Sequence, residues 1–320
     1  MRVTLRTEPN ELAALVSQAA AARGIPQAFV EKDFWVTELL RSIASPPIDF
    51  MQSDVIRKPR AIFKGGTSLS RAYHLIERFS EDVDILVTPG TLEVESRKLD
   101  KVLQLIDKCA RPNILEKGAK ARVVRGKVGI FSHVEYDYPR QSDTSSLRPH
   151  IFLELGVRGG DAPTQQKEIR SMLAEIATED LHILDDISEF MPFSMEVLAP
   201  ERTLIEKLSA LHSAQPEAMR MLGRHLYDVN ALLSSRETTQ RLQGHAAELA
   251  EDTVQISHLY GWPAEARPEA GFAASRIFTL GSEKNRALRR SYALVAPLVY
   301  GHFPAFEDCI SNIQAHADIL

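Results

Sequence analysis

Hydrophobic residues alternate with polar ones in several short stretches of this chain and recur at helical spacing in longer ones. Short apolar or alternating runs are typical of strands, and recurrence every three to four residues is typical of amphipathic helices. Strands are predicted at residues 61–63, 82–87, 117–127, 130–138, 150–157 and 192–197. Helices are predicted at residues 8–44, with a break at 24–26, and at 66–78, 91–110, 162–178, 200–212 and 216–233. This mixture predicts an α/β (α+β) fold.

The predicted strands end before residue 200, and the remainder of the chain is helical. We therefore expect one domain at residues 1–199, with N-terminal helices and a small mixed sheet, and a helical domain at residues 200–320. A site is expected in the cleft between them. The length of 320 residues and the apolar fraction of 44% fit one large or two small globular domains.

A glycine-rich turn follows the first predicted strand. Gly65 and Gly66 let the backbone approach an anion closely, and Thr67 and Ser68 stand where the first turn of a helix offers free amides. The same four residues also suit an ordinary turn with a helix cap, which needs no ligand.

Two carboxylates follow on the next predicted strand. The two-residue period of a strand puts Asp82 and Asp84 on one face and apolar residues on the other. Paired carboxylates on a rigid element are typical of Mg²⁺ sites in phosphoryl chemistry, although a solvated strand face has the same pattern. A strand, turn, helix and strand in succession bring the glycines and the carboxylates to one edge of a sheet, which favours a nucleotide site.

These two segments resemble a known motif. Residues 64–69, Lys-Gly-Gly-Thr-Ser-Leu, with residues 78–84, Arg-Phe-Ser-Glu-Asp-Val-Asp, resemble the first motif of the AbiEii/AbiGii-type nucleotidyltransferases. That family is a branch of the polymerase-beta-like nucleotidyltransferase superfamily and includes the MenT toxins. The resemblance implies nucleotide binding by Lys64, Gly65, Gly66, Thr67 and Ser68, and a metal on Asp82 and Asp84. A P-loop fits poorly because Lys64 precedes the glycines.

In the superfamily a third acid joins the Asp pair from a neighbouring strand. Glu154 suits this role because it stands alone among apolar neighbours on its side of the strand at 150–157, and a buried charge needs a partner. Asp137 and Glu135, on the preceding strand, remain alternatives. The resemblance thus makes Asp82, Asp84 and Glu154 the expected metal ligands and catalytic acids.

The second half of the family motif set falls on two later helices. Glu206-Lys207 is followed about twenty residues later by residues 224–228, Arg-His-Leu-Tyr-Asp. In the family the lysine contacts nucleotide phosphates and the aspartate is required in the same site, so the resemblance implies catalytic roles for Lys207 and Asp228. Facing helices would also pair these two charges. A purely structural ion pair and an Arg224–Asp228 pair along one helix remain open, and a buried core histidine is preferred over a catalytic base at His225.

Three further polar segments have open interpretations. Lys32 and Asp33 either border the nucleotide site, as in the family, or form a charged helix face. Cations are frequent between Lys117 and Lys127, where no acid occurs, and this strip either protects an edge strand or contacts an RNA backbone. A second basic cluster around residues 284–290 has the same ambiguity.

The resemblance implies the toxin of a toxin–antitoxin pair. Its expected reaction moves a nucleoside monophosphate from an NTP, with a pyrimidine favoured, to a hydroxyl acceptor, with Mg²⁺ as cofactor and release of pyrophosphate. The expected acceptor is the 3′ end of tRNA, and the expected partner is a cognate antitoxin. Transfer or phosphorylation on a protein or small molecule, and a non-catalytic nucleotide- or antitoxin-binding module, are the alternatives.

Composition and charge narrow the functions and the kinds of site that the chain can have. The net charge of −5 argues against indiscriminate nucleic-acid binding but permits a local basic patch. The two cysteines are 200 positions apart, and no His-x-x-x-His pair occurs, so neither a disulfide nor a zinc site is expected. We find no signal peptide and no apolar run that would span a membrane, and we expect a cytoplasmic protein.

Overall fold

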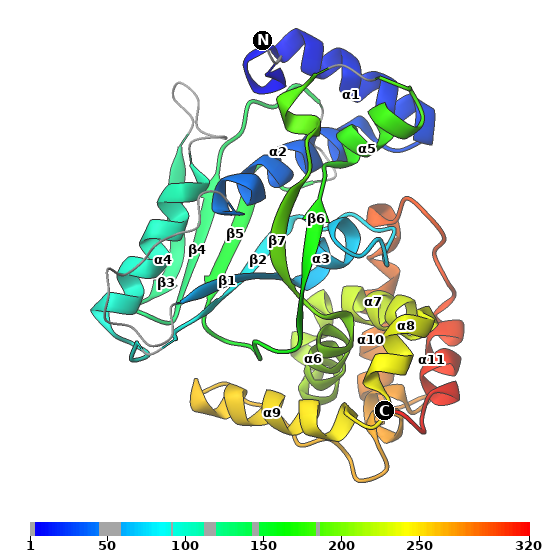
Figure 1. Cartoon of the computed structure of the whole chain (residues 1–320). Helices are drawn as coiled ribbons and strands as arrows, with labels where there is room; N and C mark the ends of the chain where they lie inside the picture. The colour runs from blue at the N-terminus through cyan, green and yellow to red at the C-terminus, as the bar shows by residue number, and fades with distance from the viewer. Residues whose placement is uncertain (1–3, 45–58, 91, 112–119, 143–146, 184–185) are drawn as a thin grey trace. The chain divides into compact units, whose positions relative to one another are not determined.

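The computed structural model describes residues 4–44, 59–90, 92–111, 120–142, 147–183 and 186–320. The chain divides into two compact units, whose elements are drawn in Figure 1. Unit 1 comprises Met1–Ala72, Ser80–Val157 and Gln165–Val197, and unit 2 comprises Tyr73–Phe79, Arg158–Thr164 and Leu198–Leu320. Two short segments from the first 199 residues thus pack with the C-terminal part. The division into domains at residues 1–199 and 200–320 stays a prediction.

Within the described residues, unit 1 is built on a seven-stranded sheet with the order β3-β4-β5-β2-β1-β7-β6. The strands are β1 (Arg60–Lys64), β2 (Asp82–Thr88), β3 (Ala121–Lys127), β4 (Phe131–Tyr136), β5 (Ile151–Gly156), β6 (Thr164–Ile169) and β7 (Phe193–Leu198). Strand β2 pairs antiparallel with β1 and parallel with β5, and β4 pairs antiparallel with both β5 and β3. The sheet is mixed, and the predicted α/β fold is confirmed.

One face of this sheet is covered by helices. Val83 and Ile85 of β2, Leu153 of β5 and Val134 of β4 are almost fully buried, as the period of two requires for a covered face. The hydroxyl of Tyr136 on the same face of β4 donates a hydrogen bond to Asp107 of α4. The helical elements of unit 1 are η1 (Leu5–Thr7), α1 (Pro9–Arg23), α2 (Gln27–Ala44), α3 (Gly65–Arg71), α4 (Arg97–Ala110), α5 (Met172–Glu179) and η2 (Ser188–Phe190).

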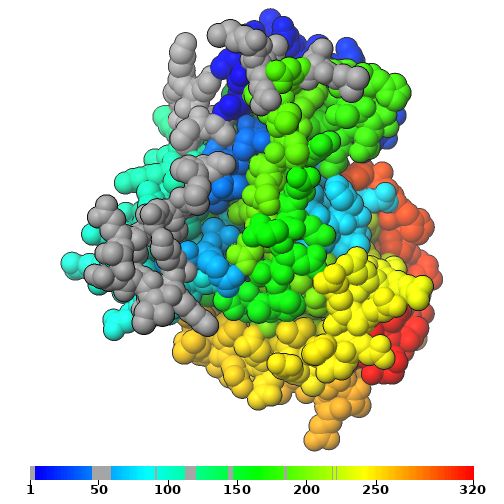
Figure 2. Space-filling view, in the orientation of Figure 1, coloured from blue at the N-terminus to red at the C-terminus, as the bar shows by residue number. Residues whose placement is uncertain are grey.

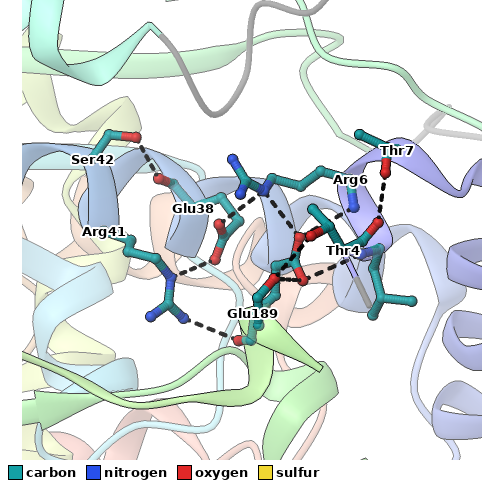
Figure 3. Close-up of polar contacts among 9 residues, drawn as sticks. Thr4, Arg6, Thr7, Glu38, Arg41, Ser42 and Glu189 are labelled. Atoms are coloured by element: carbon teal, nitrogen blue, oxygen red, sulfur yellow. Dashed lines mark hydrogen bonds and ion pairs between the residues drawn. The ribbon is translucent and has the colours of Figure 1, made fainter. Parts of the chain in front are cut away.

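A buried glutamate anchors the N-terminal turn to this layer (Figure 3). Glu189 of η2 accepts hydrogen bonds from the backbone N–H groups of Leu5 and Arg6, each at 3.2 Å, and from Nε of Arg6 at 2.9 Å. Arg41 of α2 donates to the carbonyl oxygen of Glu189 and pairs with Glu38 at 2.8 Å. Glu189 therefore holds the N-terminal turn through its carboxylate and α2 through its backbone carbonyl.

Unit 2 is helical, as predicted for the C-terminal part. Its elements are α6 (Pro200–Ser213), η3 (Pro216–Met221), α7 (Gly223–Ser234), α8 (Arg236–Leu242), α9 (Ala246–Leu259), η4 (Phe272–Ala274), η5 (Arg276–Phe278), α10 (Glu283–Ala293), η6 (Ala296–Leu298) and α11 (Phe306–Ala315). Helix α6 packs on α7, α8 and α9, and α7 also packs on α10 and α11. The segment at 73–79 joins this unit through a hydrogen bond of 2.7 Å from the Phe79 N–H to the Leu298 carbonyl.

The helix predicted at residues 162–178 is wrong in its first half. Thr164–Ile169 forms the edge strand β6, which is seen with β7 in green on the face of unit 1 shown in Figure 2. Its side chains are exposed or half-buried except for Ile169. Ser171 then caps α5, because its hydroxyl accepts from the N–H of Ala174 at 3.1 Å. Ile169, at the end of β6, lies three positions before Met172, the first residue of α5. This spacing made Ile169 look like part of the apolar face of the helix.

Two other boundaries also differ from the prediction. The helix expected to reach residue 78 ends at Arg71, and the chain then leaves unit 1. The helix expected at residues 216–233 is divided into η3 and α7. Lys117, in the predicted basic strip, and Thr91, at the start of a predicted helix, lie outside the described residues. Within the described residues, no helix combines the length and apolar character required to cross a bilayer.

Candidate nucleotide site

The turn between β1 and α3 depends on a glycine at position 65. Gly65 has φ +77°, which glycine adopts without the steric cost that side chains incur. A Cβ atom built at this position would lie 2.0 Å from Oδ2 of Asp84. The Asp84 carboxylate therefore rests directly on the glycine backbone, and any side chain at position 65 would displace it.

The two hydroxyls of the turn are already used inside the protein. Thr67 donates a hydrogen bond to the backbone carbonyl of Asp82, and Ser68 donates to the carbonyl of Gly65 at 2.9 Å. Both side chains are buried, as is Gly66. Thr67 thus ties α3 to the start of β2. In this arrangement the hydroxyls stabilise the turn, and their predicted contact with phosphates stays a proposal.

The carboxylates form a row across the sheet, on the face opposite the buried apolar one. Strand register places Lys64 of β1 opposite Asp84 of β2, and Asp84 beside Glu154 of β5. Side chains that are paired in register point to the same face. Asp82 lies two residues before Asp84 on the same side of β2. The structure therefore brings together Lys64, Asp82, Asp84 and Glu154, with the Gly65 turn beneath them.

The electrostatics of this row favour a bound cation. Burial, followed by the negative charge of Asp82, raises the pKa of Glu154 above its ordinary value of 4.5. Strand register also makes Glu154 a neighbour of Asp84. A cation bound beside these carboxylates would favour their ionised forms and so lower the pKa of Glu154.

These residues fit a magnesium ion that arrives with its substrate. Among the residues that the structure describes, no group of three or more Asp, Glu, His or Cys side chains is arranged to hold a metal by itself. Mg²⁺ prefers one or two carboxylates together with waters and substrate phosphates over a cage made only of protein groups. Asp82 and Asp84 lie as such a pair on one face of β2, and the metal-binding roles predicted for Asp82, Asp84 and Glu154 stay predictions.

Neither of the alternative third acids is a neighbour of Asp84 in register. Glu135 of β4 faces the edge strand and pairs with Arg122 at 2.5 Å. Asp137 lies beyond the end of β4 and pairs with Nδ1 of His150 at 2.7 Å. Glu154 is the one of the three that strand register places next to Asp84, so the geometry favours it as the third acid.

A chain of charges that the sequence interpretation missed connects α2 to Asp82. Lys32, which is fully buried, donates to Glu81 at 3.0 Å and to the carbonyl of Arg148 at 2.9 Å. Glu81 accepts in turn from the N–H of Arg148, whose guanidinium pairs with Asp82 at 3.0 Å. Lys32 thus contacts the segment that carries the first carboxylate. Asp33 instead accepts from the N–H of Met172 and pairs with the buried Arg71 at the end of α3.

Unit 2 holds the other two predicted site residues in one buried cluster. Nζ of Lys207 on α6 lies 2.8 Å from Oδ2 of Asp228 on α7. Arg78 grips the same carboxylate with two nitrogens, at 2.7 and 2.6 Å. Asp228 is fully buried, and although burial alone would raise its pKa, Arg78 and Lys207 hold it well below the ordinary value of 3.8. The predicted pairing of Lys207 with Asp228 is present.

His225 lies in the surroundings of the same cluster. Burial, then the positive charge of Lys207, lowers the pKa of His225 to about 3, so its imidazole is neutral at physiological pH. Its Nδ1 atom is buried and has no hydrogen-bond partner among the described residues. These features agree with the preferred interpretation of His225 as a core histidine.

The roles of Arg78 and Arg148 were not predicted. Arg78 belongs to the first family motif, and its contact with Asp228 spans 150 positions, so no local pattern indicates the pair. Arg148 follows a polar loop and precedes β5. For Arg78, the sequence held one signal: it stands four residues before the Asp-x-Asp pair and next to an apolar residue. An arginine buried there requires a carboxylate partner.

The comparisons with known proteins identify the family. The sequence profile described as the nucleotidyl transferase AbiEii toxin of type IV toxin–antitoxin systems matches residues 49–312. A search of curated proteins found no significant match. Seven chains of solved structures match. One of them is MenT4, a nucleotidyltransferase toxin from Mycobacterium tuberculosis, with 16% sequence identity, a TM-score of 0.48, and coverage of 96% of this chain and 93% of that chain. The profile covers most of the chain, and the chain therefore belongs to the AbiEii nucleotidyltransferase toxin family.

Proposed function

We propose that this toxin transfers a nucleoside monophosphate from a magnesium-bound NTP to the 3′ end of tRNA and releases pyrophosphate. The observation that carries the proposal is the row of Lys64, Asp84 and Glu154 over the Gly65 turn, with Asp82 on the same face. A cation, three carboxyl groups and the half-buried backbone of Gly65 form the surroundings that a metal-bound triphosphate requires.

Each residue of the row has a definable task. Asp82 and Asp84 would hold Mg²⁺, which when bound neutralises the charge that develops on the leaving pyrophosphate. The Gly65 and Gly66 backbone would lie against the terminal phosphates, and Lys64 would add positive charge beside Asp84. Glu154, with its raised pKa, would orient the attacking hydroxyl or complete the metal site.

The cluster in unit 2 would provide the lysine that binds phosphate. Asp228 accepts from both Arg78 and Lys207, so it fixes the ammonium group of Lys207 at one position. The family resemblance, in which the lysine contacts nucleotide phosphates, is what assigns Lys207 and Asp228 to the nucleotide.

The acceptor and the nucleotide follow from the family resemblance. The proposed acceptor is tRNA, the favoured nucleotide is a pyrimidine NTP, the proposed partner is a cognate antitoxin, and the proposed compartment is the cytoplasm. The charge of −5 over the whole chain is compatible with RNA binding only if cations gather locally, as they do on β3.

The direct test is to sequence RNA 3′ ends after incubation of purified protein, Mg²⁺ and total tRNA with each NTP in turn. The proposal predicts added nucleotides on tRNA with one or two NTPs and none with Asp84→Asn. An α-labelled NTP that labels a protein or a small molecule but no RNA would replace tRNA with that acceptor. Equal growth inhibition by the wild type and Asp84→Ala would indicate a binding module without turnover.

A further inference from the structure

The carboxylate row continues into a strip of aromatic side chains on the same face of the sheet. Phe152 of β5 lies beside Asp82 in register, and His133 of β4 lies opposite Glu154. Phe131 is two residues before His133 on the same side of β4. The ring centroids of Phe131 and His133 are 4.9 Å apart, and those of His133 and Phe152 are 5.5 Å apart. All three rings are half-buried, so each keeps an accessible part.

Beyond the aromatic strip, the edge strand β3 presents cations to this face. Register places Arg122 opposite Glu135, Arg125 opposite His133 and Lys127 opposite Phe131. A bulge between residues 123 and 125 keeps all three cations on one side. The Arg125 guanidinium lies 5.5 Å from the centre of the Phe131 ring. On this face β3 presents cations, β4 and β5 present the aromatic rings, and β5 and β2 present the carboxylates, while Glu135 of β4 is paired with Arg122.

Protection of a sheet edge explains only part of this pattern. Lysines and arginines on an edge strand discourage pairing with other chains. That role requires neither cations confined to one face nor neighbouring rings that remain accessible. Cations beside stacked aromatic rings are instead typical of surfaces that bind single-stranded nucleic acid, where bases stack on the rings and phosphates contact the cations.

We propose that the surface formed by Arg125, Lys127 and Phe131 with His133 and Phe152 binds the single-stranded 3′ end of the acceptor RNA. The inference rests on the proposed function in that it assigns this RNA as the substrate of the neighbouring carboxylates. Strand β4 is two strands from β2, a distance of about 10 Å, so a base stacked on β4 leaves the next nucleotide within reach of Asp82 and Asp84.

Arg148 connects the two parts of the surface. Its guanidinium lies 5.7 Å from the centre of the Phe152 ring and 3.0 Å from Asp82. It is half-exposed, while its backbone is held by Lys32 and Glu81. An incoming 3′ nucleotide would therefore meet a positioned cation between the aromatic strip and the carboxylates.

The ion pairs already present on β3 do not block this role. Arg122 pairs with Glu135, and Lys127 pairs with Glu95 at 2.7 Å, with both Lys127 and Glu95 side chains 58% exposed. Exposed pairs of this kind contribute little stability, and phosphates compete for them readily. His133 adds stacking area without charge, because burial lowers its pKa below the ordinary value of 6.5.

The test is binding of a fluorescent single-stranded RNA oligonucleotide ending in CCA to the full-length protein, without NTP. Arg125→Gln/Lys127→Gln should weaken binding about tenfold and reduce the slope of log K against log salt by about 0.7 for each phosphate that is no longer neutralised. Phe131→Leu should weaken binding about fivefold or more with no change in that slope. The matched control is Lys98→Gln/Lys101→Gln, which removes the same charge from exposed positions of α4, the helix on the other face of the sheet.

The outcomes separate this inference from the proposed function. Equal weakening by the control pair would show that net charge alone governs binding, and would overturn the inference. Unchanged binding by Phe131→Leu, or equal affinity for a blunt RNA duplex, would overturn stacking of single-stranded RNA on this face. The binding assay needs no catalysis. If the wild type binds RNA through these residues but never extends it, the proposed function is contradicted and the inferred RNA-binding surface is not. Circular dichroism of each variant checks folding.

Discussion

Asp228 and Lys207 form one ion pair, yet their substitutions should have different costs because Arg78 contacts only one of them. Asp228→Asn would leave two cations, Arg78 and Lys207, without their shared carboxylate in a fully buried position. Removing one partner of a buried ion pair destabilises a protein by about 3–5 kcal/mol. Lys207→Met leaves the two-point contact between Arg78 and Asp228 in place, and we expect a cost of about 1–2 kcal/mol.

The assay is urea unfolding of both variants, with Glu307→Gln as control. Glu307 pairs with Arg289 on the surface of the same unit, and exposed pairs contribute little, so the control should unfold like the wild type. Nucleotide transfer by each folded variant is measured in parallel. Lys207→Met should be well folded but inactive if its ammonium binds phosphate. Equal destabilisation by Asp228→Asn and Lys207→Met would refute the assignment of Arg78 as the main partner of Asp228.

The loss of folding stability caused by Asp228→Asn should depend on pH in a defined direction. Arg78 and Lys207 depress the pKa of Asp228 in the folded protein, although burial opposes them. A carboxyl group with a depressed pKa stabilises the fold above its unfolded pKa and loses that contribution as the pH falls through the folded value. The difference in stability between wild type and Asp228→Asn should therefore be largest near neutral pH and shrink below about pH 4.

Three further predictions concern unit 1. Gly65→Ala should abolish NTP binding because a Cβ atom would lie 2.0 Å from Oδ2 of Asp84 at a positive φ, and calorimetric titration with Mg-NTP measures it. Glu189→Ala should destabilise the protein by about 2–4 kcal/mol in thermal unfolding, because it frees the anchored Leu5 and Arg6; an unchanged melting temperature would contradict the role of this carboxylate. Glu154→Gln should raise the melting temperature of the metal-free protein at neutral pH, since a raised pKa means that ionised Glu154 opposes folding, and the gain should vanish as the pH falls below 4.5.

The sequence was informative where local geometry determines the result. The two-residue period of β2 was sufficient to place Asp82 and Asp84 on one face, and the observed register agrees. The glycine turn was recognised from Gly65 and Gly66, since few other residues permit that backbone. The family motifs identified Lys207 and Asp228, whose pairing across two helices then followed from their charges.

The sequence was uninformative where the partner is distant or the pattern is ambiguous. Nothing local indicates that Arg78 contacts Asp228, because that contact forms only when the segment at 73–79 packs with unit 2. The edge strand β6 is mostly polar, so its pattern lacked the apolar alternation of a central strand. The aromatic strip joins residues of β4 and β5 whose neighbourhood depends on sheet order, which single-sequence patterns do not specify.

The central claim of the proposed function is that binding of a magnesium-bound NTP requires both Asp82 and Lys207. Its most direct test is calorimetric titration of Mg-NTP into the wild type, Asp82→Ala and Lys207→Met, each shown to be folded. The account predicts Mg²⁺-dependent binding by the wild type, no Mg²⁺-dependent binding by Asp82→Ala, and affinity weakened at least about tenfold in Lys207→Met. Undiminished binding by either folded variant would contradict it.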